Sequence, residues 1–195
     1  MQSTKIIKIL VVDDDQDFRR LIADTLEQEK SFLVTGVCKS REEAVEVAVE
    51  SEPDIVLMDL NLCGSGMDGI EAAKEIRRKT NAKVLILSGY EDQETILKAS
   101  RTAFASGYVM KSQFFMLVPT ILQTMQGQTP QSIMISSAIL QQLSAAEQTV
   151  FRRMIGEDVM LHSSEKTIAN QQTSILKKLG LSSKKELSHM FSVYS

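Results

Sequence analysis

Residues 54–59, Asp-Ile-Val-Leu-Met-Asp, place four apolar side chains between two carboxylates. Pro53 precedes this run and a glycine-rich loop follows it, so both ends carry residues that interrupt regular structure. A short, continuous apolar run of this kind is typical of a strand buried on both faces of a parallel sheet. We therefore expect Asp59 where a central strand leaves the core, at the sheet edge where open α/β folds carry their sites.

Other stretches of strand character alternate with helical periodicity along residues 8–125. Ser40 and Glu43 form a capping box before the second helical segment. The alternation predicts an α/β fold: a five-stranded parallel sheet with helices on both faces, joined by right-handed crossovers. The expected strands are 8–12, 32–37, 54–59, 83–87 and 107–110, and helical spacing runs through about 18–26, 43–48, 69–78, 93–104 and 114–125.

Reactive side chains follow these strands: Asp13 and Asp14 the first, Asp59 the third, Ser88 the fourth and Lys111 the fifth. Parallel strands end at one edge of the sheet, so these groups are expected to converge. Three carboxylates need a cation to stay ionised together, and hard oxygen ligands suit Mg²⁺. Lys111 adds a fixed positive charge. Such a site fits a phosphoryl group, with Asp59 attacking in line and Ser88 donating to the product.

The donor of that phosphoryl group is expected to be bound elsewhere. Residues 1–127 contain no Gly-rich nucleotide loop of the Walker kind and no histidine that could act as a general base. Aspartate-nucleophile phosphatases, which also begin with acids after an apolar strand, fit poorly. Their Asp-x-Asp motif is followed by x-Thr or x-Val, whereas Asp13-x-Asp15 is followed by Gln16-Asp17. We therefore do not expect an enzyme.

Five motifs occur in this part of the chain: Val-Val-Asp-Asp (11–14), Met-Asp-Leu-Asn (58–61), Met-Asp-Gly-Ile-Glu (67–71), Leu-Ser-Gly (87–89) and Gly-Tyr-Val-Met-Lys (107–111). They give residues 5–127 a specific resemblance to the receiver domain of bacterial two-component response regulators, which has a flavodoxin-like fold. The resemblance implies a sensor histidine kinase as phosphoryl donor. Residue by residue, it implies Asp59 as phosphoacceptor; Asp13, Asp14, Asp59 and the Asn61 carbonyl as Mg²⁺ ligands; and Ser88, Tyr108 and Lys111 as switch residues.

One departure lies beside the acceptor. The family usually has Met-Pro-Gly after the Asn, whereas residues 62–66, Leu-Cys-Gly-Ser-Gly, lack the proline and make a longer loop. More glycine loosens a loop. We expect this loop to alter phosphate lifetime or partner contact and to leave the metal-binding acids intact.

After Gly127-Gln-Thr-Pro130 only helices are expected, which divides the chain into 1–127, a linker or helix at 128–142, and 143–195. Capping boxes at Ser144 with Glu147 and at Ser183 with Glu186 begin two helices. Ser163 or Ser164 caps a longer helix between them, which Gly180 stops. The expected inward side chains are Val150, Phe151, Met154, Ile155, Ile168, Ile175, Leu176, Leu179, Leu187, Met190 and Phe191.

Three stretches of the C-terminal part stand out: Leu143-Ser144 with Glu147, Ser-Glu-Lys-Thr-Ile (164–168) and Ile-Leu-Lys-Lys-Leu-Gly-Leu-Ser-Ser (175–183). Through them residues 143–191 resemble, more faintly, the LuxR-type helix-turn-helix output domain of the nitrate and quorum-sensing regulators. This resemblance makes 167–179 the recognition helix, which would enter the DNA major groove. The candidate DNA-binding residues are Lys166, Thr167, Asn170, Gln171, Gln172, Lys177 and Lys178.

Two departures bear on DNA binding. The family places a whole scaffold helix before the recognition helix, but the seven residues 157–163 supply at most about two turns. The face 169–173, Ala-Asn-Gln-Gln-Thr, also replaces basic residues with neutral ones. Asn and Gln read adenine edges, whereas phosphate contacts supply much of the affinity, so any binding is expected to be weak and very salt-sensitive.

Two functions therefore remain open. The first is a response regulator that binds DNA as a homodimer on phosphorylation and regulates transcription. The second keeps the receiver but gives the C-terminal helices a role in protein contacts or dimerisation.

Composition agrees with either function. Residues 1–127 hold 15 Lys/Arg against 20 Asp/Glu, and residues 128–195 hold 7 against 5, so only the C-terminal part has a balance that suits nucleic acid. No signal-peptide pattern or bilayer-length apolar run is present, which predicts a cytoplasmic protein without membrane contact. Cys38 and Cys63 lack metal-ligand spacing and are expected to be structural or incidental.

Overall fold

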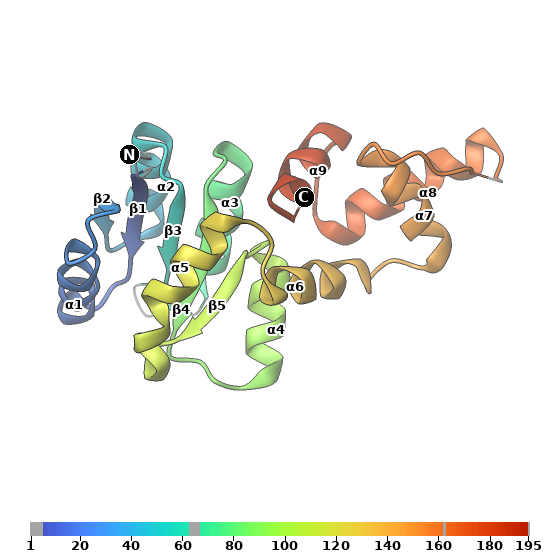
Figure 1. Cartoon of the computed structure of the whole chain (residues 1–195). Helices are drawn as coiled ribbons and strands as arrows, with labels where there is room; N and C mark the ends of the chain where they lie inside the picture. The colour runs from blue at the N-terminus through green and yellow to red at the C-terminus, as the bar shows by residue number, and fades with distance from the viewer. Residues whose placement is uncertain (1–5, 63–66, 162, 195) are drawn as a thin grey trace.

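A parallel sheet forms the centre of the N-terminal part (Figure 1). The computed structural model describes residues 6–62, 67–161 and 163–194. The expected five-stranded parallel sheet is confirmed, in the order β2-β1-β3-β4-β5. Its strands are β1 (Ile7–Val12), β2 (Phe32–Cys38), β3 (Ile55–Met58), β4 (Lys83–Ser88) and β5 (Gly107–Met110). All four residues of β3 are buried, as its unbroken apolar run predicts.

Helices cover both faces of this sheet, and each face has its own core. One core joins the sheet to α1 and α5, through residues such as Ile22 and Ile121. The other joins it to α2, α3 and α4, through residues such as Ala48, Ile76 and Ala99. The helices are α1 (Gln16–Glu27), α2 (Arg41–Ser51), α3 (Asp68–Lys79), α4 (Gln93–Thr102) and α5 (Leu117–Gln126).

Two local expectations need correction. The last receiver helix was expected from about 114, but a 3-10 segment, η1 (Lys111–Met116), comes first because Gln113 has a non-helical backbone. The capping box at α2 is half formed: Ser40 accepts from the Glu43 amide, while the Glu43 carboxylate accepts from the Lys39 amide. Helix α2 still begins directly after Ser40, and α5 begins at Leu117, close to the expected start.

The remaining described residues form helices only, as expected. They are α6 (Pro130–Leu140), α7 (Ala145–Met154), α8 (Glu165–Leu179), α9 (Lys184–Phe191) and the 3-10 turn η2 (Ser192–Tyr194). The α7 capping box is complete, and Gly180 ends α8 with a φ of 63°. Ile155 was expected inside, but it lies beyond the last turn of α7 and 36% of its surface is exposed.

The segment between α7 and α8 confirms the expected loss of the scaffold helix. Residues 157–161 and 163–164 adopt no helix, and 162 lies outside the described residues. The same holds for Cys63 and the rest of the loop at 63–66, so the expected effect of that loop stays a prediction. Within the described part of the chain, no helix is both long and apolar enough to cross a membrane.

The C-terminal helices pack directly on the N-terminal part (Figure 1). Helix α9 lies against α3, and α6 lies against α4 and β5. Arg77 of α3 is fully buried and donates to the carbonyls of Ala82 and Met190 at 3.2 and 2.6 Å. The Phe191 ring of α9 packs edge-on against Phe104. One continuous core therefore includes residues on both sides of the expected boundary near 127.

The Glu147 carboxylate connects α7 to α8. It accepts hydrogen bonds from the Ser144 amide, the Ser174 hydroxyl and the Lys178 ammonium at 2.7, 2.7 and 2.6 Å. The donors from Lys178, Ser174 and Ser144 together lower the pKa of Glu147 from 4.5 to about 2. The folded structure thus stabilises the charged form of the Glu147 carboxylate.

We expect Glu147→Gln to remove a pH-dependent part of the stability. Because the folded-state pKa is depressed, the stabilisation is complete above the unfolded pKa near 4.5 and is lost as the pH falls through about 2. The shift corresponds to roughly 3 kcal/mol at most. Urea unfolding should show a difference between wild type and Glu147→Gln at about pH 5 that shrinks by about pH 2.5. Glu157→Gln, which alters an exposed pair with Arg152, is the matched control. A difference that does not change with pH would contradict this assignment.

Candidate functional site

The register of the sheet brings the strand ends together. Val12 of β1 pairs with Met58 of β3, and the Asp59 amide donates to the Val12 carbonyl at 2.8 Å. Asp13 and Asp59, the next residues on each strand, are therefore neighbours at the carboxyl edge of the sheet. This is the convergence that the sequence predicts.

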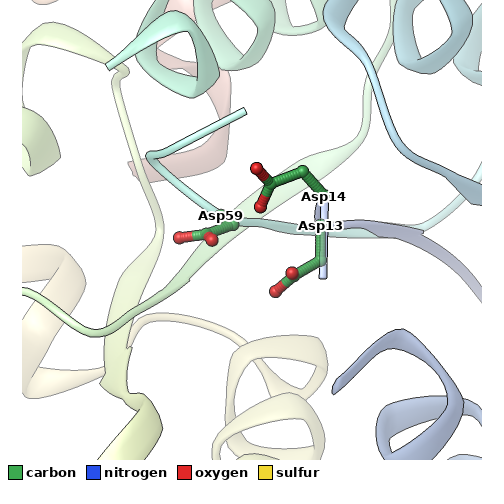
Figure 2. A group of neighbouring side chains, drawn as sticks. All are labelled: Asp13, Asp14 and Asp59. Atoms are coloured by element: carbon green, nitrogen blue, oxygen red, sulfur yellow. The ribbon is translucent and has the colours of Figure 1, made fainter. Parts of the chain in front are cut away.

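Three carboxylates meet at this edge (Figure 2). Asp13, Asp14 and Asp59 each offer an oxygen, and these oxygens all lie within 4.8 Å of one another. Asp13 and Asp59 are only 1% and 5% exposed, whereas Asp14 is exposed. Burial raises the pKa of Asp13, although a hydrogen bond from Lys111 opposes the shift. Two buried acids and one exposed acid fit a divalent cation that keeps part of its hydration shell.

Lys111 bridges two of these acids. Its ammonium lies 2.7 Å from Asp13 Oδ2 and 2.9 Å from Asp59 Oδ2. It also lies 4.5 Å from the centre of the Phe18 ring. Burial works against its charge, but the hydrogen bonds to Asp13 and Asp59 prevail and raise the pKa of Lys111. A permanent cation therefore faces the acidic cluster, as expected from its place after the fifth strand.

Asp14, Asp15 and Asp59 line a cavity of about 360 Å³, together with Asn61, Ser88 and Lys111. The Ser88 hydroxyl oxygen is buried and makes no hydrogen bond of normal geometry within the described part of the chain, although it lies close enough to the Tyr108 hydroxyl to exert a lowering effect on that group's pKa. A buried hydroxyl whose hydrogen bonding is incomplete is costly unless a ligand completes it. The cavity therefore contains a hydroxyl beside a cation and an acidic cluster, which fits an anionic group bound together with a metal ion.

Tyr108 lies next to this cavity on β5. Its hydroxyl donates to the Tyr90 carbonyl at 2.8 Å, and burial raises the pKa of Tyr108 to about 12. Its backbone amide donates to the Gln131 side chain of α6 at 2.9 Å. Tyr108 thus contacts both the loop after β4 and the first helix of the C-terminal part.

Sequence reasoning missed three contributors to this site. Phe18 was interpreted only as an apolar residue on a helix, Gln131 was assigned no role, and Gly69 was quoted only within a motif. A Cβ on Gly69 would lie 1.8 Å from the Asp59 carbonyl oxygen, so only glycine lets α3 begin here. The available signals were the position of Phe18 one turn after the first acids and the glycine ten residues after Asp59.

The candidate DNA-binding residues all lie on or beside α8 but face different surroundings. Lys166, Thr167 and Asn170 are exposed, whereas Gln171 and Gln172 are partly buried. At the other end of the helix, Lys178 pairs with Glu147 at 2.6 Å, and Lys177 and Lys178 line a hollow against α3 and α4. The structure therefore does not present these residues as one free basic surface.

Residues 9–136 match the family described as the response regulator receiver domain. The chain belongs to this family. Similarity to this response regulator extends beyond the receiver in some relatives. The transcriptional regulatory protein YdfI of Bacillus subtilis (strain 168) is 26% identical over 202 residues, which is 92% of each chain.

Two solved structures resemble this response regulator. A LuxR-family two-component response regulator from Aurantimonas sp. SI85-9A1 is 34% identical, with a TM-score of 0.59 over 70% of this chain and 97% of that one. The RcsB response regulator of Salmonella typhimurium, a structure described as showing conformational dynamism for DNA interaction, is 25% identical. Its TM-score is 0.56, over 96% of this chain and 98% of that one. The expected LuxR-type family and receiver fold are confirmed.

Proposed function

We propose that Asp59 accepts a phosphoryl group from a sensor histidine kinase, with Mg²⁺ held by Asp13, Asp14, Asp59 and the Asn61 carbonyl. The main support is that Lys111 bridges Asp13 and Asp59 beside a cavity that the buried Ser88 hydroxyl also lines. Mg²⁺ would neutralise phosphoryl oxygens during transfer.

The protein groups then have distinct roles. An Asp59 carboxylate oxygen forms the new bond to phosphorus as the bond to the donor nitrogen breaks. The Lys111 ammonium already lies 2.9 Å from Asp59 Oδ2. It can therefore give up part of its contact with the two carboxylates and bind a phosphoryl oxygen on Asp59. Ser88 supplies the hydroxyl that hydrogen-bonds the product.

The route from this site to the output runs through Tyr108. Its hydroxyl reaches the loop after β4, and its amide reaches Gln131 of α6. A change around Ser88 that moves Tyr108 would therefore act on a helix beyond the receiver. This direct contact supports the C-terminal helices as the element that phosphorylation controls.

The output that we favour is transcriptional: a cytoplasmic regulator that forms a homodimer when phosphorylated and binds DNA through the start of α8. The name of YdfI and the similarity to RcsB over nearly the whole chain support it. Lys166, Thr167 and Asn170 are exposed there and free to meet DNA. Gln171, Gln172, Lys177 and Lys178 would contribute only if α8 leaves its present contacts.

The second candidate output is a protein contact. The described residues between α7 and α8 lack the scaffold helix that braces a recognition helix on DNA. Lys178 is already neutralised by Glu147. The core that joins α9 to α3 and α4 also makes release of the C-terminal helices costly.

Labelling tests the acceptor. Incubation with a small phosphodonor and Mg²⁺ should phosphorylate the wild type and leave Asp59→Ala unlabelled. Asp54→Ala is the matched control because Asp54 precedes the same strand at its opposite end, so this variant should label like the wild type. Labelling of Asp59→Ala would refute the assignment.

A salt titration of DNA binding separates the two outputs. We expect the phosphorylated protein to bind promoter DNA weakly at low salt and to lose this binding as the salt concentration rises, with a log–log slope set by the number of phosphates it contacts. Lys166→Gln should weaken binding and reduce the slope by about 1, whereas Lys98→Gln on α4 should not. Absence of binding at low salt would remove the transcriptional output and leave the protein-contact one.

A further inference from the structure

A second polar hollow lies far from the acidic cluster, where the C-terminal end of α8 meets α3 and α4. It has a volume of about 170 Å³. Four cationic side chains line it, and no acidic side chain does among the described residues: Lys74 from α3, Arg101 from α4, and Lys177 and Lys178 from α8. Thr102 and Gln142 add polar groups to the wall.

Most of this positive charge has no acidic partner at ion-pair distance. Of these four cations, only Lys178 makes an ion pair within the described residues, with Glu147 at 2.6 Å. Lys74 is half-buried, and its ammonium lies 2.8 Å from the position that a Cβ on Gly180 would take. Burial and the nearby Arg78 guanidinium lower the pKa of Lys74, and the more weakly acting Glu71 and Glu186 carboxylates oppose this shift. Cationic side chains thus surround a space that the protein leaves open.

Helix dipoles explain only part of the arrangement. Arg101, Lys177 and Lys178 lie in the last turns of α4 and α8, where a cation is stabilised by unpaired carbonyls. Lys74 lies inside α3, before its last turn, so the dipole does not account for it. A long, flexible ammonium that accepts partial burial beside other cations is better explained by an anion that bridges them.

We propose that this hollow binds a small free oxyanion of the phosphate class, held by Lys74, Arg101 and Lys177. The size of the hollow argues for inorganic phosphate or pyrophosphate, because pockets for drug-sized ligands are about 300 Å³ or larger. Its ligands come from the receiver and from α8, so a bound anion fastens α8 to the receiver and keeps Lys177 from other partners. The proposal does not rest on the assignment of Asp59, but a bound anion would compete with DNA for Lys177, which is also a candidate contact of the proposed transcriptional output.

The test follows backbone amides by NMR while inorganic phosphate, and separately pyrophosphate, is added to the full chain in magnesium-free, low-salt buffer. We expect saturable shifts at Arg101, Lys177 and Gly180. Lys74→Met and Arg101→Gln should each weaken binding about tenfold or more. Lys98→Met, which removes an exposed α4 charge outside the hollow, should bind within about twofold of the wild type.

Thermal melting separates loss of binding from loss of fold. Lys74→Met removes an unpaired cation, so its melting temperature without phosphate should be no lower than that of the wild type. Phosphate should raise the melting temperature of the wild type and not that of Lys74→Met. The proposal is overturned if the shifts are absent or do not saturate, or if duplex DNA shifts these amides while phosphate and pyrophosphate do not. It is also overturned if Lys74→Met binds phosphate like the wild type, or if Lys98→Met is weakened as much as Lys74→Met.

Discussion

Gly69→Ala is expected to destabilise the protein by about 3 kcal/mol or more and to reduce labelling of Asp59 at least tenfold. The new Cβ would lie 1.8 Å from the Asp59 carbonyl oxygen and 2.9 Å from the Leu60 Cα. Both contacts are to backbone, so no side chain can rotate away. Either α3 or the end of β3 must move, and that movement displaces the acceptor carboxylate.

Gly89→Ala is the matched control. Gly89 directly follows β4 and lines the cavity beside Asp59, but a Cβ there meets nothing within 4 Å. Its effect on the free energy of unfolding should stay within about 0.5 kcal/mol. Urea denaturation of both variants, with phosphodonor labelling of each, measures the difference. Equal stabilities for the two variants would mean that α3 has room to retreat from Asp59.

Phe191→Ala is expected to cost about 3 kcal/mol or more, and to lower the stability of the whole chain. Phe191 is 6% exposed, and its ring lies 5.7 Å from Phe104, 4.7 Å from Phe151 and 5.7 Å from Tyr194, measured between ring centres. Its removal leaves a cavity between α4 and the C-terminal helices. Because the core is continuous, unfolding should remain one cooperative transition at a lower denaturant concentration.

Phe115→Ala provides the comparison, because Phe115 is 75% exposed and its truncation opens no cavity. Its unfolding midpoint should barely move. Two separate transitions in Phe191→Ala, with the receiver transition unchanged from wild type, would show that the C-terminal helices fold as an independent unit.

The sheet and the acidic cluster were predictable because both follow from short-range patterns. Apolar runs such as 54–59 define buried strands, and parallel strands place their following residues at one edge. Ile155 was misplaced because helical spacing assumes that the helix continues, whereas α7 ends before it. The ring of Phe18 below Lys111 and the bond from Tyr108 to Gln131 depend on tertiary packing, which periodicity does not encode.

The docking of α9 left a signal in the sequence that is easy to overlook. Ile70, Ala73 and Arg77 share one face of α3 at helical spacing, and all three are buried. A cation on an otherwise apolar face indicates that another segment supplies acceptors for it. That segment is α9, whose Met190 carbonyl accepts from Arg77. Periodicity thus indicates that Arg77 needs a partner but not which segment provides it.

Arg77 also affects how the chain acquires its structure in time. Its hydrogen bond to Met190 spans 113 positions, and burial lowers the pKa of the guanidinium to about 10 without removing its charge at neutral pH. During synthesis at about 5–20 residues per second, Met190 is added on the order of ten seconds after Arg77. Until then this side of α3 stays exposed to water, and α9 covers it only after residue 190 has been made. Such long-range closure also predicts slow refolding in vitro.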